Sequence, residues 1–332
     1  MARITFLGNF QVDYSSENHH AKSLESLGHE VIRLQEGVWG AKTSDILFEA
    51  MRSDLFVWVH THGWSNPGDL DLTRLLELLK VANIPTMTYH LDLWFGLQRQ
   101  VDLENDGFYS KIGHFFATDK LMADWFNKET DVIGHYLPAG VYDKEVYVHP
   151  DYDANNFDYD VIFVGSKGYH PEYPYRPQLI EFLKYTYGNR FLHVGPDGET
   201  GTVRGDALNR IYARSKVAIG DSLNINFSYP YYSSDRLFES TGRGGFTIYP
   251  DITGLNQFFE DGKEIAFYPH GNLDKLKEKI DYYLDNDEER EQIRFAGHQR
   301  TKNEHTYTHR WETIVSKLGI KEIINFYMEE NK

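Results

Sequence analysis

Segments that look like strands and segments that look like helices alternate along almost the whole of this chain. Apolar runs typical of strands cover 2–8, 31–34, 54–60, 84–90, 112–118 and 131–137. Amphipathic stretches typical of helices lie between them at 17–27, 43–52, 71–82 and 119–127. Neighbouring parallel strands need a crossover, usually a helix, so this alternation indicates a parallel sheet with helices on both faces. We therefore expect the first half of the chain to form a doubly wound α/β domain.

A polar, acidic and turn-rich stretch at 142–159 interrupts the alternation. A second run follows, with strands predicted at 160–165, 190–194, 216–220 and 264–268 and another ending near 250. Helices are predicted at 176–187, 205–214, 272–285, 287–302 and 309–329. The sequence thus predicts a domain over 1–141, a linker over 142–159 and a second domain over 160–308. Two such domains form a cleft, and open α/β sheets bind ligands at the carboxyl ends of their strands.

Composition narrows the function classes. The 332 residues include 50 acidic and 34 basic side chains, for a formal net charge of −16. A protein that binds a phosphate backbone needs a basic surface, so this balance counts against nucleic acid as a partner, although a local basic cleft stays compatible with it. The absence of cysteine removes disulfides and thiolate sites. With no apolar run of roughly 20 residues and a strand-like start, we expect no membrane span, no signal peptide and a cytoplasmic protein.

Two common nucleotide-binding fingerprints are missing. The chain has no G-x-G-x-x-G after its first strand and no G-x-x-x-x-G-K-[ST], which argues against an NAD dehydrogenase and a P-loop NTPase. The loop 165–168, with Ser166 and Lys167, follows a predicted strand and can present N–H groups and a positive charge to a phosphate. A plain flexible turn is the alternative. The Asp-x-Asp triplets at 69–71, 151–153 and 158–160 are interpreted as solvated acids, so no metal site is predicted.

The segment 235–250 is the most informative local pattern. It predicts a short helix, a turn containing Gly242, Gly244 and Gly245, and a buried strand. Serines at 233 and 234 are candidate caps for this helix. We expect Glu239 to be buried on it, where an acid needs a partner, and a sugar diol is one such partner.

In the first half, polar side chains at the ends of predicted strands are candidates for catalysis. His60, His62 and His90 follow apolar runs, and Asp13 lies in the loop after the first strand. A residue just beyond a parallel strand faces the cleft, and imidazole titrates near neutral pH. A structural hydrogen-bonding role is the alternative for each histidine.

The C-terminal third resembles the donor domain of a known enzyme family. The stretches that carry the resemblance read DRLFE at 235–239, GGF at 244–246, GLNQFFEDGKE at 254–264, YYLDNDEER at 282–290 and EHTYTHRW at 304–311. They are similar to glycosyltransferases of the GT-B superfamily, group 1, and especially to its CgeB-like branch. The resemblance implies two Rossmann-like domains facing a central cleft. It also implies that the segment 309–332 is a helix that packs back on the first domain.

The resemblance also implies roles for particular residues. Glu239 would accept hydrogen bonds from the ribose of a nucleotide-diphosphate sugar, with a UDP-sugar as the expected co-substrate and no separate cofactor. Positive charge stabilises the departing diphosphate when no metal is used. The residues expected to bind the donor are Glu239, Lys167, Arg243, Gly244, Arg236, Ser166 and Gly195, with Arg176 as a further candidate. His90 would contact the transferred sugar, and Asp13 or a histidine would serve as base in an inverting reaction.

One departure from the family pattern keeps the chemistry open. Many retaining members carry a second glutamate eight positions before the ribose-binding one, and Tyr231 stands there, with Asp235 or a tyrosine hydroxyl as its replacement. The leading hypothesis is a metal-independent hexosyl- or pentosyltransferase, either retaining or inverting. Its acceptor is a glycan, small molecule, protein or modified nucleic-acid base, bound by residues 9–20, 60–70 and 90–110. The alternatives are an inactive nucleotide-sugar-binding protein and an epimerase or hydrolase of the same fold.

Overall fold

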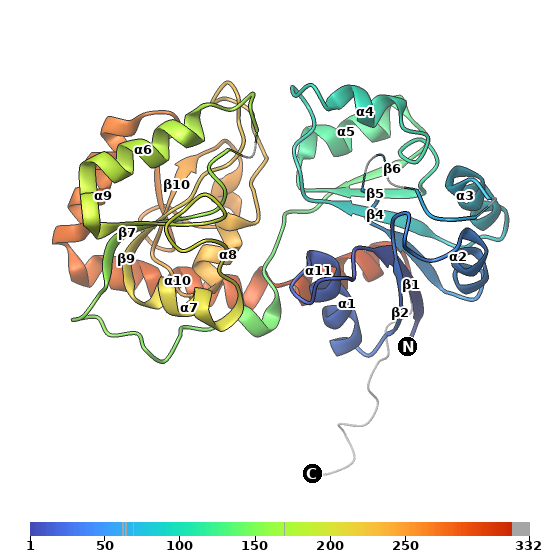
Figure 1. The fold of residues 1–332 in the computed structure, drawn as a ribbon, viewed down its shortest axis with the longest axis horizontal. Helices are drawn as coiled ribbons and strands as arrows, with labels where there is room; N and C mark the ends of the chain where they lie inside the picture. The colour runs from blue at the N-terminus through green and yellow to red at the C-terminus, as the bar shows by residue number, and fades with distance from the viewer. Residues whose placement is uncertain (62, 64, 69, 169, 321–332) are drawn as a thin grey trace, which may run out of the picture.

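The chain folds around two parallel sheets that lie in its two halves (Figure 1). The structure, a computed structural model, describes residues 1–320 with the exception of 62, 64, 69 and 169. The sheet of the N-terminal half has six strands in the order β2-β1-β3-β4-β5-β6. Its strands are β1 (Arg3–Gly8), β2 (Glu30–Gln35), β3 (Leu55–Trp58), β4 (Thr86–His90), β5 (His114–Ala117) and β6 (Ile133–Tyr136). All its neighbouring strands pair in parallel, as the alternating sequence predicts.

The sheet of the C-terminal half has five strands in the order β11-β10-β9-β7-β8. They are β7 (Tyr159–Val164), β8 (Phe191–Val194), β9 (Ser215–Ile219), β10 (Thr247–Asp251) and β11 (Ala266–Pro269). These strands also pair in parallel throughout. The doubly wound α/β fold class predicted for both halves is therefore confirmed.

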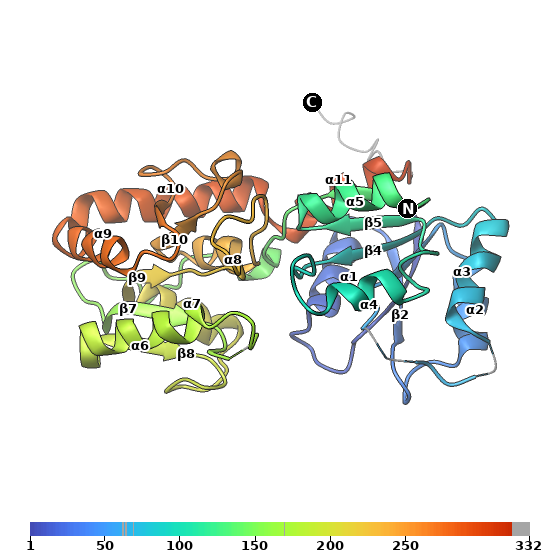
Figure 2. The same ribbon diagram turned by 90° about the horizontal axis from the view of Figure 1, so that it is seen from above.

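Helices connect the strands and cover both faces of each sheet (Figures 1 and 2). In the N-terminal half they are α1 (Ser16–Ser26), α2 (Thr43–Ala50), α3 (Leu72–Val81), α4 (Gln100–Asn105) and α5 (Lys120–Glu129). In the C-terminal half they are α6 (Tyr175–Tyr187), α7 (Gly205–Ala213), α8 (Arg236–Gly242), α9 (Leu273–Asp285) and α10 (Asp287–Glu304). Short 3-10 helices span Asp143–Glu145, Gly188–Arg190 and Leu255–Gln257. None of the helices among the described residues combines the length and the apolar character needed to cross a membrane.

The chain crosses between the halves twice, and the two crossings run side by side. Val141 and Thr306 form a parallel bridge, in which the Val141 amide donates to His305 and the Tyr307 amide donates to Val141. Beyond this point α11 (Tyr307–Lys317) packs on α1, and the Trp311 indole donates to Nδ1 of His20 at 3.2 Å. The predicted return of the C-terminal helix to the first half is confirmed. The uninterrupted helix predicted over 309–329 is wrong, because α11 stops at Lys317 and Gly319 follows in a left-handed conformation (φ 64°). Residues 321–329 of that prediction lie outside the described residues.

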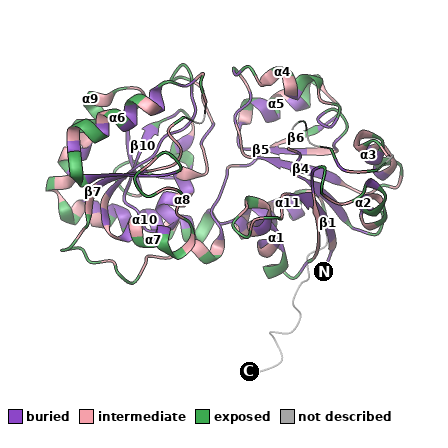
Figure 3. Cartoon of the chain, viewed as in Figure 1, coloured by how far each residue is buried: buried purple, intermediate pink, exposed green. Residues whose placement is uncertain are grey.

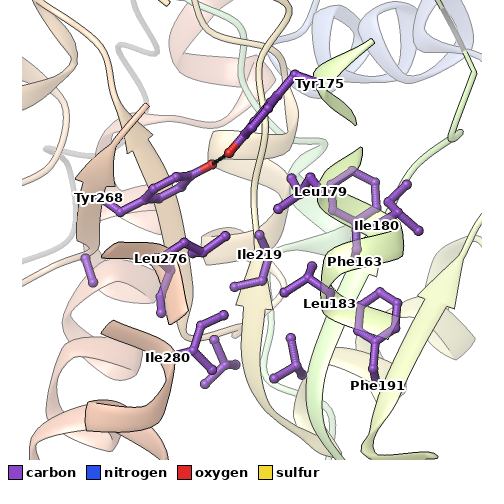
Figure 4. Close-up of a cluster of buried hydrophobic side chains, with 14 of the residues drawn as sticks. Phe163, Tyr175, Leu179, Ile180, Leu183, Phe191, Ile219, Tyr268, Leu276 and Ile280 are labelled. Atoms are coloured by element: carbon purple, nitrogen blue, oxygen red, sulfur yellow. Dashed lines mark hydrogen bonds between the residues drawn. The ribbon is translucent and has the colours of Figure 1, made fainter. Parts of the chain in front are cut away.

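Each sheet is sandwiched in apolar side chains, and burial follows the strands and the helix faces that cover them (Figure 3). The largest cluster fills the C-terminal half, where Leu179 and Leu183 of α6 and Leu276 and Ile280 of α9 pack on the sheet (Figure 4). Within it the hydroxyl groups of Tyr175 and Tyr268 lie 3.1 Å apart and satisfy each other. Such a core holds the strand ends, and the loops that follow them, in fixed positions. Helix α4 was not predicted from the sequence. The exact domain boundaries remain predictions.

Candidate functional site

A pocket of about 380 Å³ opens between the two halves. Residues at the carboxyl ends of strands line it, as expected for sheets of this type. From the N-terminal half it receives Tyr14, Ser16, His19 and Asp92. From the C-terminal half it receives mainly Gly165, Ser166, Arg176, Gly195, Pro196, Arg204, Tyr232, Ser234, Asp235, Arg236, Glu239 and Arg243. The two segments that cross between the halves also contribute to the lining, through Glu145 and Tyr307.

The helix α8 presents the largest share of polar groups to this pocket. Asp235 is its N-cap residue, and no side chain caps the helix. The predicted serine caps are wrong, because the Ser234 hydroxyl donates to the carbonyl of Asp221 at 3.1 Å and Ser233 is buried before the helix begins. The expected burial of Glu239 is also wrong. Its side chain is 33% exposed and lines the pocket, so it is free to accept hydrogen bonds from a ligand.

The four arginines that line the pocket fall into two groups. Arg176 donates to the buried carboxylate of Asp221 at 2.8 Å, and Arg243 pairs with Glu145 and donates to Asn209 at 2.6 Å. Arg243 is 1% exposed, so its charge is already neutralised inside the protein. Both of these arginines hold the walls of the pocket together.

Arg236 and Arg204 differ, because no carboxylate among the described residues forms an ion pair with them. They donate to carbonyl groups, and Arg236 also donates to the Ser234 hydroxyl at 3.4 Å. Nε of Arg236 donates to Val164 at 2.5 Å and its Nη1 donates to Asp221 at 3.0 Å, while Arg204 donates to Val203 at 3.1 Å. Carbonyls orient a guanidinium without cancelling its charge. These two side chains therefore offer positive charge to an anionic ligand.

Close packing between two turns fixes Arg236. A side chain at Gly165, where φ is 142°, would place its Cβ 2.4 Å from Nη2 of Arg236. A Cβ at Gly195 would lie 2.2 Å from the carbonyl oxygen of Gly165. Only glycine permits these approaches. The glycines after β7 and β8 thus allow the backbone and the guanidinium to meet at one wall of the pocket.

Carboxylates from both halves face this pocket. Burial raises the pKa of Asp235 to about 6, and the negative charges of Glu239 and Asp92 raise it as well. Asp92 belongs to the loop after β4 and lines the same pocket as Asp235, so the two halves approach closely here. A proton or a ligand hydroxyl can bridge such carboxylates.

Asp13 and His90, the predicted catalytic residues of the N-terminal half, lie outside the pocket lining. Asp13 is exposed on the loop after β1. His90 is buried, its Nδ1 accepts from the Trp94 indole at 3.2 Å, and burial lowers its pKa to about 4. Its imidazole is thus neutral near pH 7.

The structure brings together five of the seven residues predicted to bind the donor: Glu239, Arg243, Arg236, Ser166 and Gly195. Lys167 instead pairs with Glu181 on α6. Gly244 is buried against Val148, with φ 80°, and serves the turn after α8. Tyr14 and Asp92 lie within the ranges 9–20 and 90–110 predicted for the acceptor but were not singled out, and Arg204 was not predicted. Tyr14 could have been found by its place one residue beyond Asp13, whereas nothing local distinguishes Arg204.

Residues 176–316 match the family model described as glycosyl transferase-like. The matched region contains α8 and every pocket residue of the C-terminal half from Arg176 onward. The glycosyl transferase-like region therefore contributes Arg236, Glu239 and both ion-paired arginines to the site.

Solved structures show that the whole chain has the GT-B-like fold. Sucrose-phosphate synthase from Thermosynechococcus elongatus is 12% identical, with a TM-score of 0.61, and the match covers 96% of this chain and 98% of that one. An alpha-glucosyltransferase in complex with UDP-glucose and DNA containing an abasic site has 10% identity, a TM-score of 0.64 and coverage of 96% and 99%. HepE of Anabaena, in complex with UDP and glucose, has 13% identity, a TM-score of 0.63 and coverage of 96% and 100%. No curated protein sequence matches this chain.

Proposed function

We propose that this protein transfers a sugar from a UDP-sugar to a hydroxyl acceptor, without a metal ion. The observation that carries the proposal is the juxtaposition of Glu239 and Arg236 on one turn of α8, inside the pocket between the sheets. Three solved structures of the same fold hold UDP, glucose or UDP-glucose, which supports this choice of nucleotide and a hexose.

In the proposed complex Glu239 accepts hydrogen bonds from the two ribose hydroxyls. Arg236 and Arg204 contact the diphosphate, and the N–H groups around Ser166 assist them. Positive charge held in place before the reaction stabilises the charge that develops on the leaving nucleoside diphosphate. The two arginines thereby stabilise the negative charge that a metal ion stabilises in other transferases.

We propose that Asp235 replaces the carboxylate that the family pattern expects at Tyr231. Tyr231 itself does not line the pocket, because its ring packs beneath Gly254. Asp235 lines the pocket one helical turn before Glu239. We assign it to the hydroxyl groups of the transferred sugar, on the other side of the diphosphate from the ribose.

The first test measures the thermal unfolding of the protein in the presence of UDP, GDP, ADP, CMP or TDP, or of their sugars. A ligand that binds only the folded protein raises its melting temperature. We expect the largest increase in melting temperature with UDP or a UDP-sugar. The proposal fails if none of these ligands raises the melting temperature.

Product analysis separates the transferase from the alternatives. Release of UDP that depends on an added acceptor supports transfer. Binding of UDP-glucose without any release of UDP in a broad acceptor screen would instead favour the inactive binding protein, for which the missing glutamate at Tyr231 is the specific observation. Free glucose formed without acceptor would indicate a hydrolase.

A further inference from the structure

A second group of polar side chains lies in the N-terminal half, outside the pocket. Within the part of the chain that the structure describes, four buried polar atoms there have no hydrogen-bond partner: Oε2 of Glu36, Nε1 of Trp58, Nδ1 of His60 and the hydroxyl of Tyr109. The four residues are between 1% and 7% exposed. Buried polar groups are nearly always satisfied, so several unsatisfied ones in one place call for a ligand or water.

The four side chains converge at one spot. The ring centroid of His60 lies 4.7 Å from that of Trp58 and 5.4 Å from that of Tyr109. Nδ1 of His60 and Oε1 of Glu36 are 3.8 Å apart, too far for a direct hydrogen bond. Burial raises the pKa of Glu36 to about 7, while the Thr61 amide, which donates to Oε1, and the neighbouring Trp58 indole lower it by less. We call these four residues the Glu36 cluster.

The sheet order places the Glu36 cluster beside the pocket. His60 follows β3, which lies between β1 and β4 in the sheet. The loop after β1 carries Tyr14 and the loop after β4 carries Asp92, and both of these residues line the pocket. Because all the strands are parallel, the residues after β3 lie at the same edge of the sheet as both of these loops.

The backbone at His60 has a strained conformation. Its φ is 57°, in the left-handed region that residues with a Cβ rarely adopt. Nε2 of the ring lies 2.8 Å from a carboxylate oxygen of Asp106, so this nitrogen carries the proton. In the neutral ring Nδ1 is then a bare acceptor. Strain of this kind is concentrated at functional sites.

The donors and acceptors of the Glu36 cluster match the hydroxyl group. Trp58 and Tyr109 offer N–H and O–H donors, while His60 and Glu36 offer acceptors, and a hydroxyl both donates and accepts. The carboxylates of Glu36 and Asp106 disfavour an anion. Burial raises the pKa of Tyr109 well above its usual value, and the Arg99 guanidinium, which opposes this shift, is already bound to the carbonyl of Leu93.

We propose that the Glu36 cluster binds a hydroxyl-bearing arm of a neutral carbohydrate acceptor. The inference rests on the proposed function, since it places the acceptor next to the donor pocket. Burial of all four side chains means that one arm of the sugar enters, while the rest of the acceptor lies toward the pocket.

The test uses the full chain with UDP present and methyl α-glucoside, methyl β-glucoside and glucuronate as probes, observed by ligand NMR. We expect the neutral glycosides to bind and glucuronate to bind at least roughly tenfold more weakly. Near-isosteric variants Glu36→Gln and Tyr109→Phe should each weaken glycoside binding roughly tenfold. Tyr185→Phe, at a tyrosine that is 92% exposed, is the matched control and should change nothing.

Several outcomes overturn the proposal. It fails if no neutral glycoside binds, if glucuronate binds better, or if the two variants bind as the wild type does. Calorimetry with UDP-glucose keeps the two hypotheses apart, because loss of the acceptor site leaves donor binding unchanged in the variants. If a variant does not fold, a crystal of the wild type soaked in methyl α-glucoside decides: sugar density between Glu36 and Tyr109 supports the proposal, and water alone overturns it.

Discussion

The two halves of the protein differ in how the buried polar groups in and near the cleft are paired. In the C-terminal wall, Arg176 and Arg243 each have a carboxylate partner, and Arg236 is held by two carbonyls. In the N-terminal half, outside the pocket, four polar atoms of the Glu36 cluster have no partner among the described residues, whereas the three arginines leave one such atom, Nε of Arg243. A wall whose charged groups are mostly paired in advance is rigid and suits a ligand of constant shape, such as a nucleotide. A wall with unsatisfied groups is completed by what it binds.

The largest effect that this comparison predicts is on stability, at Arg243. Arg243→Met removes one partner of a buried pair and leaves Glu145 and Asn209 facing each other without it. We expect a loss of about 3–5 kcal/mol in the free energy of unfolding, measured by urea denaturation. Arg190→Met, at an exposed arginine paired with Asp160, is the control and should cost less than about 1 kcal/mol. Equal losses would show that the C-terminal wall does not depend on its internal pairing.

The second prediction has the opposite sign and concerns Glu36. Its pKa rises from an ordinary 4.5 to about 7 because it is buried. Below pH 4.5 the group is protonated whether the chain is folded or unfolded, so it has no cost. Between pH 4.5 and 7 the unfolded chain loses the proton more readily, so stability falls as the pH rises.

Glu36→Gln cannot ionise and escapes this penalty. Relative to the wild type, it should therefore gain stability on going from pH 4 to pH 8, by up to about 3 kcal/mol. Thermal and urea unfolding at both pH values measure the gain. Glu77→Gln, at an exposed glutamate that pairs with Lys111, should show no such gain. If the difference in stability between Glu36→Gln and the wild type does not change with pH, the pKa of Glu36 is not raised by burial.

The third prediction concerns binding at the C-terminal wall. Glu239→Ala removes the acceptor assigned to the ribose and should weaken UDP binding by about 1.5–3 kcal/mol for each hydrogen bond lost. Calorimetry with UDP measures the change. Glu278→Ala, at an exposed glutamate paired with Lys275, should bind UDP normally. Unchanged affinity in a folded Glu239→Ala variant would remove the ribose assignment.

The smallest effect separates two cations that the sequence analysis treated alike. Arg236→Lys should weaken UDP binding by roughly tenfold, because an ammonium group cannot keep both carbonyl contacts while it reaches a phosphate. Lys167→Ala should change the affinity by less than about twofold, because Lys167 is paired with Glu181 on the surface. Titrations at two salt concentrations check both variants. A larger effect at Lys167 would place the diphosphate at the loop 165–168 instead.

Local patterns predicted much of the molecule. The alternation of strands and helices indicated both sheets, with boundaries within a few residues, because burial on both faces and helical amphipathicity are recorded in neighbouring residues. The short helix α4 was missed, since six residues carry too little periodicity. The pattern at 235–246 located Glu239 and Arg236, whose placement follows from one turn of helix.

What the sequence by itself determined about this protein is its doubly wound architecture and the helix that carries Glu239 and Arg236. Only the tertiary structure decided which charges are free. Arg243 and Arg236 look alike in the sequence, yet Glu145, 98 positions from Arg243, neutralises one, while the carbonyl of Val164 orients the other. The structure also gathered Glu36, Trp58, His60 and Tyr109 from separate places in the chain. Pairing and burial depend on residues distant in sequence, and local periodicity does not record them.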